Sequence, residues 1–284
     1  MSSVGILTDT TAAIPESMVK DLGIRLVPYF VHRGLETLRD MVDIRPDEFV
    51  AYLRQAVTLP TTANPSPGDY LAGLQDMART TKQIVALTMT SKGSGAYQSC
   101  KAAVAMLREK MPEVQVEVID TLRVAMSQGW AVIEAARTAL QGADLREVAA
   151  RAIEVSRRAM MIQTADTLRY LYMGGRIGRA QHLVGSLLNI KPLIGMEDGV
   201  IVPLGQARSH NQIHQMMAER VEQAVGKGRV KIAYVHAGAL QEVEKIRQLL
   251  ESHLDVVESF IAELSPALAV HTGPGTAGLC FLEV

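Results

Sequence analysis

The sequence predicts an α/β protein with two domains. Over the first 160 residues, short apolar runs alternate with helical segments, which is the pattern of a doubly wound, mostly parallel sheet. Beyond that point the strands and helices lose this regularity and predict a C-terminal α+β domain with a mixed sheet. At about 150 residues per domain, a chain of 284 residues accommodates both. We therefore place an N-terminal α/β domain at residues 1–160 and a C-terminal α+β domain at residues 161–284.

Each predicted N-terminal strand is a short apolar run. The run at 84–87 is apolar throughout, as expected for a parallel strand covered on both faces. One helix start is explicit, because Ser66 is followed by a proline at the first helical position and an acid at the third. Strands are expected at residues 4–7, 24–30, 84–87 and 114–119. Helices are expected at residues 14–22, 49–56, 67–77, 96–111, 129–140 and 145–159.

The C-terminal half contains shorter strands between two longer helices. No repeat, low-complexity tract or long linker separates it from the first half, so the boundary rests on the change of pattern. Strands are expected at residues 191–194, 200–207, 230–235, 256–262 and 278–284. Helices are expected at residues 212–224 and 241–250.

Composition and charge exclude several classes of protein. The 29 basic and 30 acidic residues give a net charge of −1, which excludes strong electrostatic attraction to nucleic acid. No uncharged apolar run reaches the roughly 18 residues of a membrane span. The first nine residues lack the basic region of a signal peptide, so we expect a cytoplasmic protein. Aromatic residues make up only 4%, against 14 methionines, and this favours an adaptable aliphatic interior or a pocket for a flexible apolar ligand.

Two polar loops follow predicted N-terminal strands. In the loop at 8–11, Asp9 is a candidate ligand-binding residue or a group that ties down backbone amides. The loop at 90–95 is rich in hydroxyls and glycine and precedes a helix, whose N-terminus favours an anionic oxygen. This second loop has neither the Gly-Lys-Ser/Thr of a phosphate-binding loop nor the Gly-x-Ser-x-Gly of a hydrolase nucleophile.

Two further candidates lie in the C-terminal half. Arg176 follows a pair of glycines, and it is a candidate anion ligand or an ion-pair partner of Asp166. His271 opens a His-Thr-Gly-Pro-Gly turn before the last strand. It is a candidate general base, an anion ligand or a structural loop histidine.

The remaining histidines and both cysteines provide no recognisable metal or redox motif. Cys100 and Cys280 have no disulfide or metal spacing and are expected to be small core residues. We therefore expect no metal and no cofactor. The histidines without a recognisable motif are His210, His214 and His236.

Seven short segments form an ordered set that resembles one known family. They include Thr61-Thr62-Ala63-Asn64-Pro65 and Ser94-Gly95-Ala96-Tyr97-Gln98. In their order along the chain they are similar to the DegV family of bacterial lipid-binding proteins, and they extend from residue 8 to residue 275. The segments are residues 8–12, 60–67, 91–99, 118–121, 166–177, 188–192 and 271–275.

The resemblance implies a carrier of one long-chain fatty acid, such as palmitate, in a tunnel between two domains. In fatty acid kinase systems, such a subunit presents the carboxylate to an ATP-binding kinase subunit, which forms the acyl phosphate. The implied protein is not itself an enzyme and has no ATP site. Its expected partners are the fatty acid, the kinase subunit and, transiently, a membrane surface.

The resemblance also implies the head-group site. The carboxylate ligands of the family fall on Thr62 and Ser94, and its loop histidine falls on His271. Because imidazole titrates near neutral pH, we expect His271 to adjust the charge of the site. The implied supporting residues are Gly93, Gly95, Arg176, Arg208 and Thr272.

Departures from the family pattern affect the surroundings of this site. Ala63 and Asn64 replace Ser-Gln, Ala96 replaces Thr, and Gly93 replaces an apolar residue. Since Gly93 enlarges the nearby space, the preferred acyl chain length is open. Arg176 and Arg208 are candidates either for orienting His271 or for meeting the kinase.

Two alternative functions compete with fatty acid carriage. One is an acyl hydrolase in which Ser94 and His271 form a triad with Asp120 or Asp9. The missing nucleophile motif argues against this enzyme. The other is a structural or regulatory module with an incidental lipid.

Overall fold

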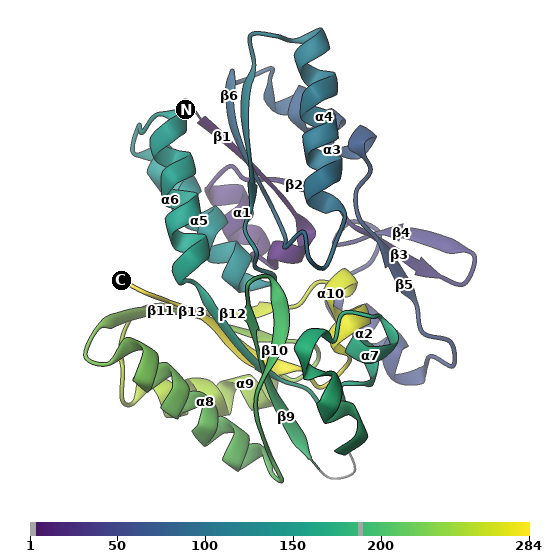
Figure 1. The fold of residues 1–284 in the computed structure, drawn as a ribbon, viewed down its shortest axis with the longest axis vertical. Helices are drawn as coiled ribbons and strands as arrows, with labels where there is room; N and C mark the ends of the chain where they lie inside the picture. The colour runs from purple at the N-terminus through teal and green to yellow at the C-terminus, as the bar shows by residue number, and fades with distance from the viewer. Residues whose placement is uncertain (1–3, 187–189) are drawn as a thin grey trace.

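The computed structural model describes residues 4–186 and 190–284 (Figure 1). The first three residues, part of the stretch used to predict localisation, lie outside the described residues, as do Leu188 and Asn189 of the sixth family-like segment. No helix in the described part of the chain is long and apolar enough to cross a membrane.

The N-terminal domain contains the predicted parallel sheet. Its four strands run in the order β2-β1-β6-β7, and all three neighbouring pairs are parallel. Helices α3 and α4 pack on one face and α5 and α6 on the other (Figure 1). The strands are β1 (Val4–Asp9), β2 (Arg25–Val27), β6 (Gln83–Thr88) and β7 (Gln115–Asp120). The helices are α1 (Glu16–Asp21), α3 (Pro67–Met77), α4 (Ala96–Lys110), α5 (Met126–Leu140) and α6 (Leu145–Arg158), with the short 3-10 turn η1 (Thr10–Ala12) after β1.

The start of α3 is built as the sequence predicted. The Ser66 hydroxyl accepts a hydrogen bond from the Asp69 amide, and the Asp69 carboxylate accepts one from the Ser66 amide. This reciprocal capping satisfies two amides that have no partner within the helix. Cys100 and Cys280 are both fully buried, so their prediction as core residues is also confirmed.

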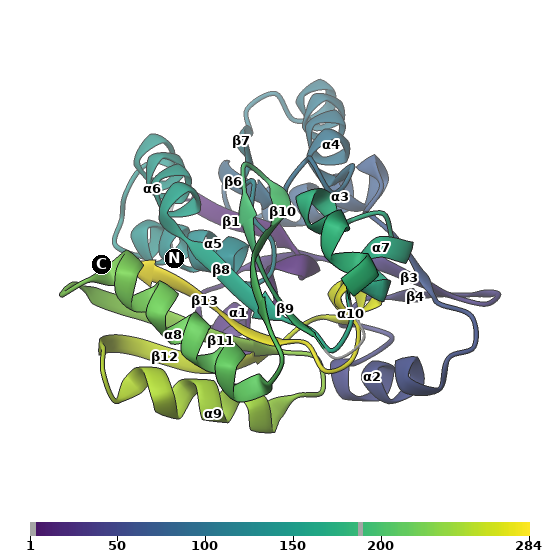
Figure 2. The same ribbon diagram turned by 60° about the horizontal axis from the view of Figure 1, so that its bottom comes forward.

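The C-terminal domain is built on a mixed sheet of six strands. The order is β10-β9-β8-β13-β11-β12, in which β11 and β12 are parallel and the other four pairs are antiparallel. Helices α8 (His210–Val225) and α9 (Leu240–Glu251) pack against this sheet (Figure 2). The strands are β8 (Met160–Thr164), β9 (Lys191–Glu197), β10 (Val200–Ala207), β11 (Arg229–His236), β12 (Asp255–Glu263) and β13 (Ala277–Glu283).

A third, small sheet was not predicted. The expected single strand at 24–30 is two strands, because Pro28 cannot donate a backbone hydrogen bond and lies between β2 and β3. The small sheet is antiparallel in the order β4-β3-β5. It consists of β3 (Phe30–Arg33), β4 (Glu36–Arg39) and β5 (Thr61–Ala63), and α2 (Pro46–Gln55) lies between β4 and β5 in the chain.

The segment that carries His271 also differs from expectation. It forms helix α10 (Pro266–Thr272), with Ser265 as the capping residue and a proline at the first helical position. His271 therefore lies in the last turn of a helix instead of in a loop. Helix α10 packs against α2 and the small sheet, so residues from the predicted N-terminal domain contact the C-terminal domain here. Two short helical segments, α7 (Arg169–Met173) and η2 (Gly178–Ser186), complete the described structure.

Helix α5 lies between the two large sheets. It contacts β1 and β6 on one side and β8 and β13 on the other. Twelve of its fifteen residues are buried, as expected for a helix covered all round. Gly129 allows the closest approach, since a Cβ there would lie 2.7 Å from the Ala12 carbonyl oxygen.

We expect two glycine-to-alanine substitutions in helices to change stability in opposite directions. Gly129→Ala is expected to destabilise the fold by about 1–3 kcal/mol, because the added methyl group overpacks α5 against η1. Gly68→Ala, on the exposed first turn of α3, is expected to stabilise it by up to about 1 kcal/mol, since its Cβ makes only an ordinary contact. Urea unfolding of both variants measures the difference. Equal effects of the two substitutions would contradict this packing of α5.

Candidate functional site

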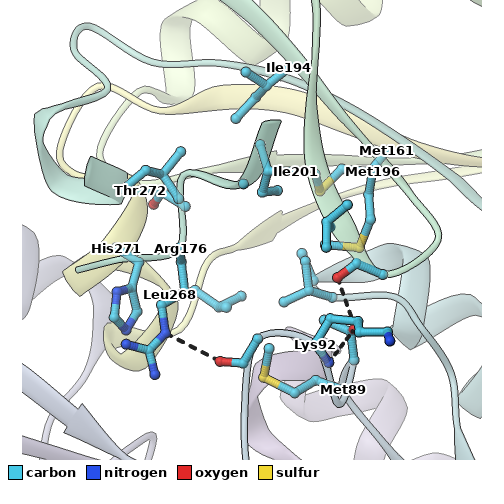
Figure 3. A pocket seen from close by; sticks show the side chains of 18 of the residues that line it. Met89, Lys92, Met161, Arg176, Ile194, Met196, Ile201, Leu268, His271 and Thr272 are labelled. Carbon is cyan, nitrogen blue, oxygen red and sulfur yellow. Dashed lines mark hydrogen bonds between the residues drawn. The ribbon is translucent and has the colours of Figure 1, made fainter. Parts of the chain in front are cut away.

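An apolar cavity of about 290 Å³ lies between the two large sheets. This volume is close to the lower end of the roughly 300–1,000 Å³ typical of ligand pockets. Residues from the loops after β6 and β7 line one wall, and β8, β9, β10, α7 and α10 supply the rest (Figure 3). The apolar lining consists mainly of Met89, Val124, Met161, Leu171, Ile194, Met196, Ile201, Leu264 and Leu268.

Polar side chains gather where α10 meets the cavity. His271, Thr272 and Arg176 line it there, and Figure 3 shows the imidazole of His271 and the guanidinium of Arg176 beside each other. The Thr272 hydroxyl is buried and has no hydrogen-bond partner among the described residues. This end of the cavity therefore offers groups that can bind a polar head group, and Thr90, Lys92 and Gln163 also line the cavity.

Thr62 and His271 are in direct contact. The Thr62 hydroxyl on β5 lies 2.8 Å from Nε2 of His271 on α10, and the tautomer decides which atom donates. Nδ1 of His271 is buried and has no hydrogen-bond partner in the part of the chain that the structure describes. The backbone of Gly174 covers that side of the ring so closely that a Cβ at this position would overlap Nδ1. The small sheet thus supplies the threonine that fixes the imidazole.

Ser94 has a different partner. Its hydroxyl lies 2.6 Å from the Tyr29 hydroxyl and also accepts a hydrogen bond from the Ala96 amide at 3.2 Å. Tyr29 is buried, and burial together with the charge of Asp9 raises the pKa of Tyr29 well above its usual value. Tyr29 is thus a neutral hydroxyl that positions Ser94.

Arg176 joins the two domains at this site. Its Nε donates to the Gly93 carbonyl at 3.2 Å, and its Nη1 donates to the Gly174 carbonyl at 2.7 Å. The suggested ion pair with Asp166 is wrong, because Asp166 pairs with Lys191 at 2.6 Å. Among the described residues no carboxylate forms an ion pair with Arg176, so its positive charge is available to an anion.

His271 does not titrate where the sequence led us to expect. Burial, and secondarily the positive charge of Arg176, lower its pKa to about 4. The imidazole is therefore neutral at pH 7, and the prediction of a ring that titrates near neutral pH is wrong for the protein alone. A neutral ring can donate or accept a hydrogen bond, whereas a charged ring can only donate.

The predicted supporting residues divide into two groups. Gly93 and Thr272 line the cavity, and Gly95 lets the loop approach β5, since a Cβ there would lie 3.0 Å from Oδ1 of Asn64. Arg208 does not reach the site. It is exposed in the connection between β10 and α8, where its amide donates to Gln212. The part of β10 that lines the cavity, Val200 and Ile201, lies several residues earlier in the chain.

Both acids proposed for a hydrolase triad have structural partners instead. Asp9 is fully buried and accepts hydrogen bonds from the Thr11 and Met89 amides, so it ties two loops together. Asp120 accepts from the Ser91 and Leu122 amides. In the described structure neither acid hydrogen-bonds to His271, and the geometry of a triad is not formed.

Sequence reasoning missed Tyr29 as a member of the site. It directly follows Pro28 and was placed in the interior of an apolar strand. A usable signal existed, because aromatic residues are only 4% of the chain and a buried tyrosine needs a partner for its hydroxyl. Its partner, Ser94, is far away in sequence, so local patterns could not reveal the contact.

Fold and site together define a two-domain α/β protein with an interdomain apolar cavity and a hydroxyl–imidazole–guanidinium end. A family model described as "Uncharacterised protein, DegV family" matches residues 3–284, and the chain belongs to the DegV family. A DegV domain-containing protein of Caldanaerobacter subterraneus is 30% identical over 284 residues, covering all of both chains.

Solved structures resemble the whole chain. A DegV family protein from Thermus thermophilus, described as fatty acid binding, has a TM-score of 0.93 and 29% identity and covers 100% of both chains. A stearic acid-binding protein from Eubacterium ventriosum has a TM-score of 0.89 and 25% identity, covering 100% of this chain and 98% of that one. The predicted family and the α/β fold are thus confirmed.

We expect His271 to stay neutral down to about pH 4 because it is buried beside Arg176. Its folded-state pKa lies below the roughly 6.5 of an unfolded histidine, so the unfolded chain binds the proton first and stability falls as the pH drops from about 6.5 to 4. Arg176→Gln is expected to raise the pKa, whereas Arg208→Gln leaves it unchanged. NMR titration of the histidine ring carbons measures both. A wild-type pKa above 6 would overturn the assignment.

Proposed function

We propose that this protein binds one long-chain fatty acid in the interdomain cavity. The observation that carries the proposal is an apolar cavity whose polar end presents His271, Thr272 and an Arg176 without a carboxylate partner. A fatty acid has the same two parts, a long apolar tail and one anionic head. The fatty acids bound by the similar Thermus and Eubacterium proteins support the same assignment.

The tail supplies most of the binding free energy. At about 0.8 kcal/mol for each buried methylene, the fourteen methylenes of palmitate contribute about 11 kcal/mol before the entropy cost of association. The carboxylate contributes differently, because a buried anion without a partner is costly. Its role is therefore to fix which end of the lipid faces Thr62, Ser94 and His271.

The head-group residues hold an anion without neutralising it fully. Hydroxyls and a neutral imidazole form hydrogen bonds, and two hydrogen bonds of Arg176 already go to backbone carbonyls. A bidentate arginine would bind the carboxylate more strongly and withdraw its charge. The arrangement favours a carboxylate oxygen that stays nucleophilic.

We further propose that the protein presents this carboxylate to an ATP-binding kinase subunit. There the carboxylate oxygen attacks the γ-phosphorus of ATP, the bond to the β-phosphate oxygen breaks, and acyl phosphate and ADP result. The sequence has neither a phosphate-binding loop nor a kinase glycine loop, which supports a carrier that does no catalysis alone. Palmitate is the first ligand to test, and a cytoplasmic location is part of the same proposal.

The first prediction concerns lipid content. Denaturing extraction of the purified protein should release about one fatty acid per chain, because burying the tail outweighs the loss of its freedom. Native mass spectrometry before and after extraction measures the mass difference. A protein that is empty as purified and also fails to bind added palmitate or oleate would remove the basis of the proposal.

The second prediction separates binding from presentation. Ser94→Ala and Thr62→Ala each remove one hydrogen bond, at about 1–3 kcal/mol, and should retain lipid because the tail contributes several times more. His271→Ala should also retain lipid but lose most acyl phosphate formation with a cognate kinase subunit, ATP and Mg²⁺. The paired measurements are extracted lipid and acyl phosphate.

Arginine variants provide the matched control for this experiment. Arg176→Ala removes a charge at the site and should lower acyl phosphate formation, whereas Arg208→Ala removes the same charge at an exposed position and should not. If Ser94→Ala and His271→Ala both support phosphorylation at the wild-type rate, the head-group assignment is wrong even though lipid is carried.

A further inference from the structure

A cluster of metal-ligating side chains lies outside the cavity. His210 and His214 are one turn apart on α8, and Glu242 faces them from α9. Their ligand atoms all lie within 4.8 Å of one another. Among the described residues, this is the one cluster of at least three His, Cys, Asp or Glu side chains that could hold a metal ion. The two histidines showed no recognisable motif in the sequence because the third member comes from a different helix.

The distances within the cluster match those between ligands of one metal ion. Nδ1 of His210 and Nε2 of His214 each lie 3.3 Å from Oε2 of Glu242. Two ligands at about 2.0–2.1 Å from zinc, separated by a tetrahedral angle, are also about 3.3 Å apart. Both histidine–glutamate separations thus suit one shared ion, and the two imidazole nitrogens lie within 4.8 Å of each other.

The three converging atoms face one another. Nδ1 of His210, Nε2 of His214 and Oε2 of Glu242 are all buried and, within residues 4–186 and 190–284, lack a hydrogen-bond partner. Their 3.3 Å separations therefore do not have hydrogen-bond geometry. Buried polar atoms normally have a partner, and His214 is only 5% exposed. Three unsatisfied atoms that meet at one point are explained together by a bound cation.

The surroundings allow an ion to enter and to stay. The side chain of His210 is 38% exposed, and His210 and Glu242 also line a surface hollow. Lys245 pairs with Oε1 of Glu242 at 2.7 Å and leaves Oε2 for the metal.

An acidic residue lies next to the outer edge of the cluster. Oδ1 of Asp166 is 4.0 Å from Nε2 of His210, on the side of the ring that points away from Glu242 Oε2. At this distance the carboxylate does not hydrogen-bond to the ring, but it lies on the side of His210 from which carboxylates orient metal-bound imidazoles. Lys191 holds Asp166 in place at 2.6 Å.

We propose that His210, His214 and Glu242 form a binding site for one divalent transition-metal ion, with zinc as the fitting ion. Two imidazole nitrogens and one carboxylate oxygen are a common set of three protein ligands for zinc, and the fourth position is open to water. The ion links α8 to α9. This site is separate from the cavity, and the proposal does not depend on fatty acid binding.

The test uses the full chain without a histidine tag, stripped with a chelator and then titrated with Zn²⁺ or Co²⁺. We expect one zinc per chain by elemental analysis, a rise in melting temperature with Zn²⁺, and the visible absorption of four-coordinate Co²⁺. His210→Ala and Glu242→Gln should weaken zinc binding by more than the 10- to 100-fold typical of losing an outer-shell partner. Because His210 is partly exposed, its variant is expected to fold.

The matched control is His253→Ala, which removes an exposed histidine just beyond α9. It should bind zinc and Co²⁺ as the wild type does. Wild-type binding no tighter than that of His210→Ala, or a loss of binding in His253→Ala, would overturn the proposal. Extracted fatty acid should be the same in all of these variants, so a failed metal site is distinguishable from a failed lipid site.

Discussion

The packing of helix α5 between two sheets is the constraint on which the rest of the structure depends. A helix buried all round cannot move with one sheet without exposing its apolar surface to water. Trp130 adds a directional contact, since its Nε1 donates to the Cys280 carbonyl on β13 at 2.9 Å. The two domains therefore share one interior, and the relative position of the cavity walls follows from it.

Charged groups reinforce the same arrangement at the edge of α5. Arg137 pairs with Glu258 of β12 at 2.6 Å, and Glu134 accepts from Lys231 of β11 at 2.9 Å. These pairs are partly buried, where they are screened less by salt than exposed pairs. Their geometry fixes the rotation of the helix relative to the C-terminal sheet. The fold thus holds the loop after β6 close to the segment after α7, and Arg176 bridges the two through the Gly93 and Gly174 carbonyls.

Much of this architecture was predictable because it is periodic. The runs at 84–87 and 114–119 form strands and the segment after Ser66 forms a capped helix, because the local sequence at each is sufficient to specify them. The small sheet was missed because Thr61–Ala63 has no strand pattern of its own and becomes a strand only by pairing with β3. Helix α10 was missed because a short apolar stretch does not distinguish helix from loop.

The site was predictable only in part for a similar reason. Family motifs pointed to Thr62, Ser94 and His271, of which His271 lines the cavity, but not to the partner of each one. The low pKa of His271 depends on burial and on Arg176, neither of which is a property of the local sequence. The contact of Tyr29 with Ser94 and the convergence of Glu242 with two histidines arise from long-range packing, which the spacing of residues along the chain does not reveal.

The contact between Gly174 and His271 has an evolutionary consequence. Because the imidazole fills the space that a side chain at position 174 would need, the ring itself excludes every residue larger than glycine there. Residues 174 and 271 are therefore expected to covary among related proteins. Lineages that keep the histidine should keep the glycine, whereas a smaller side chain at position 271 relieves the tightest contact at position 174 and leaves the Tyr170 carbonyl oxygen 3.1 Å from a Cβ there.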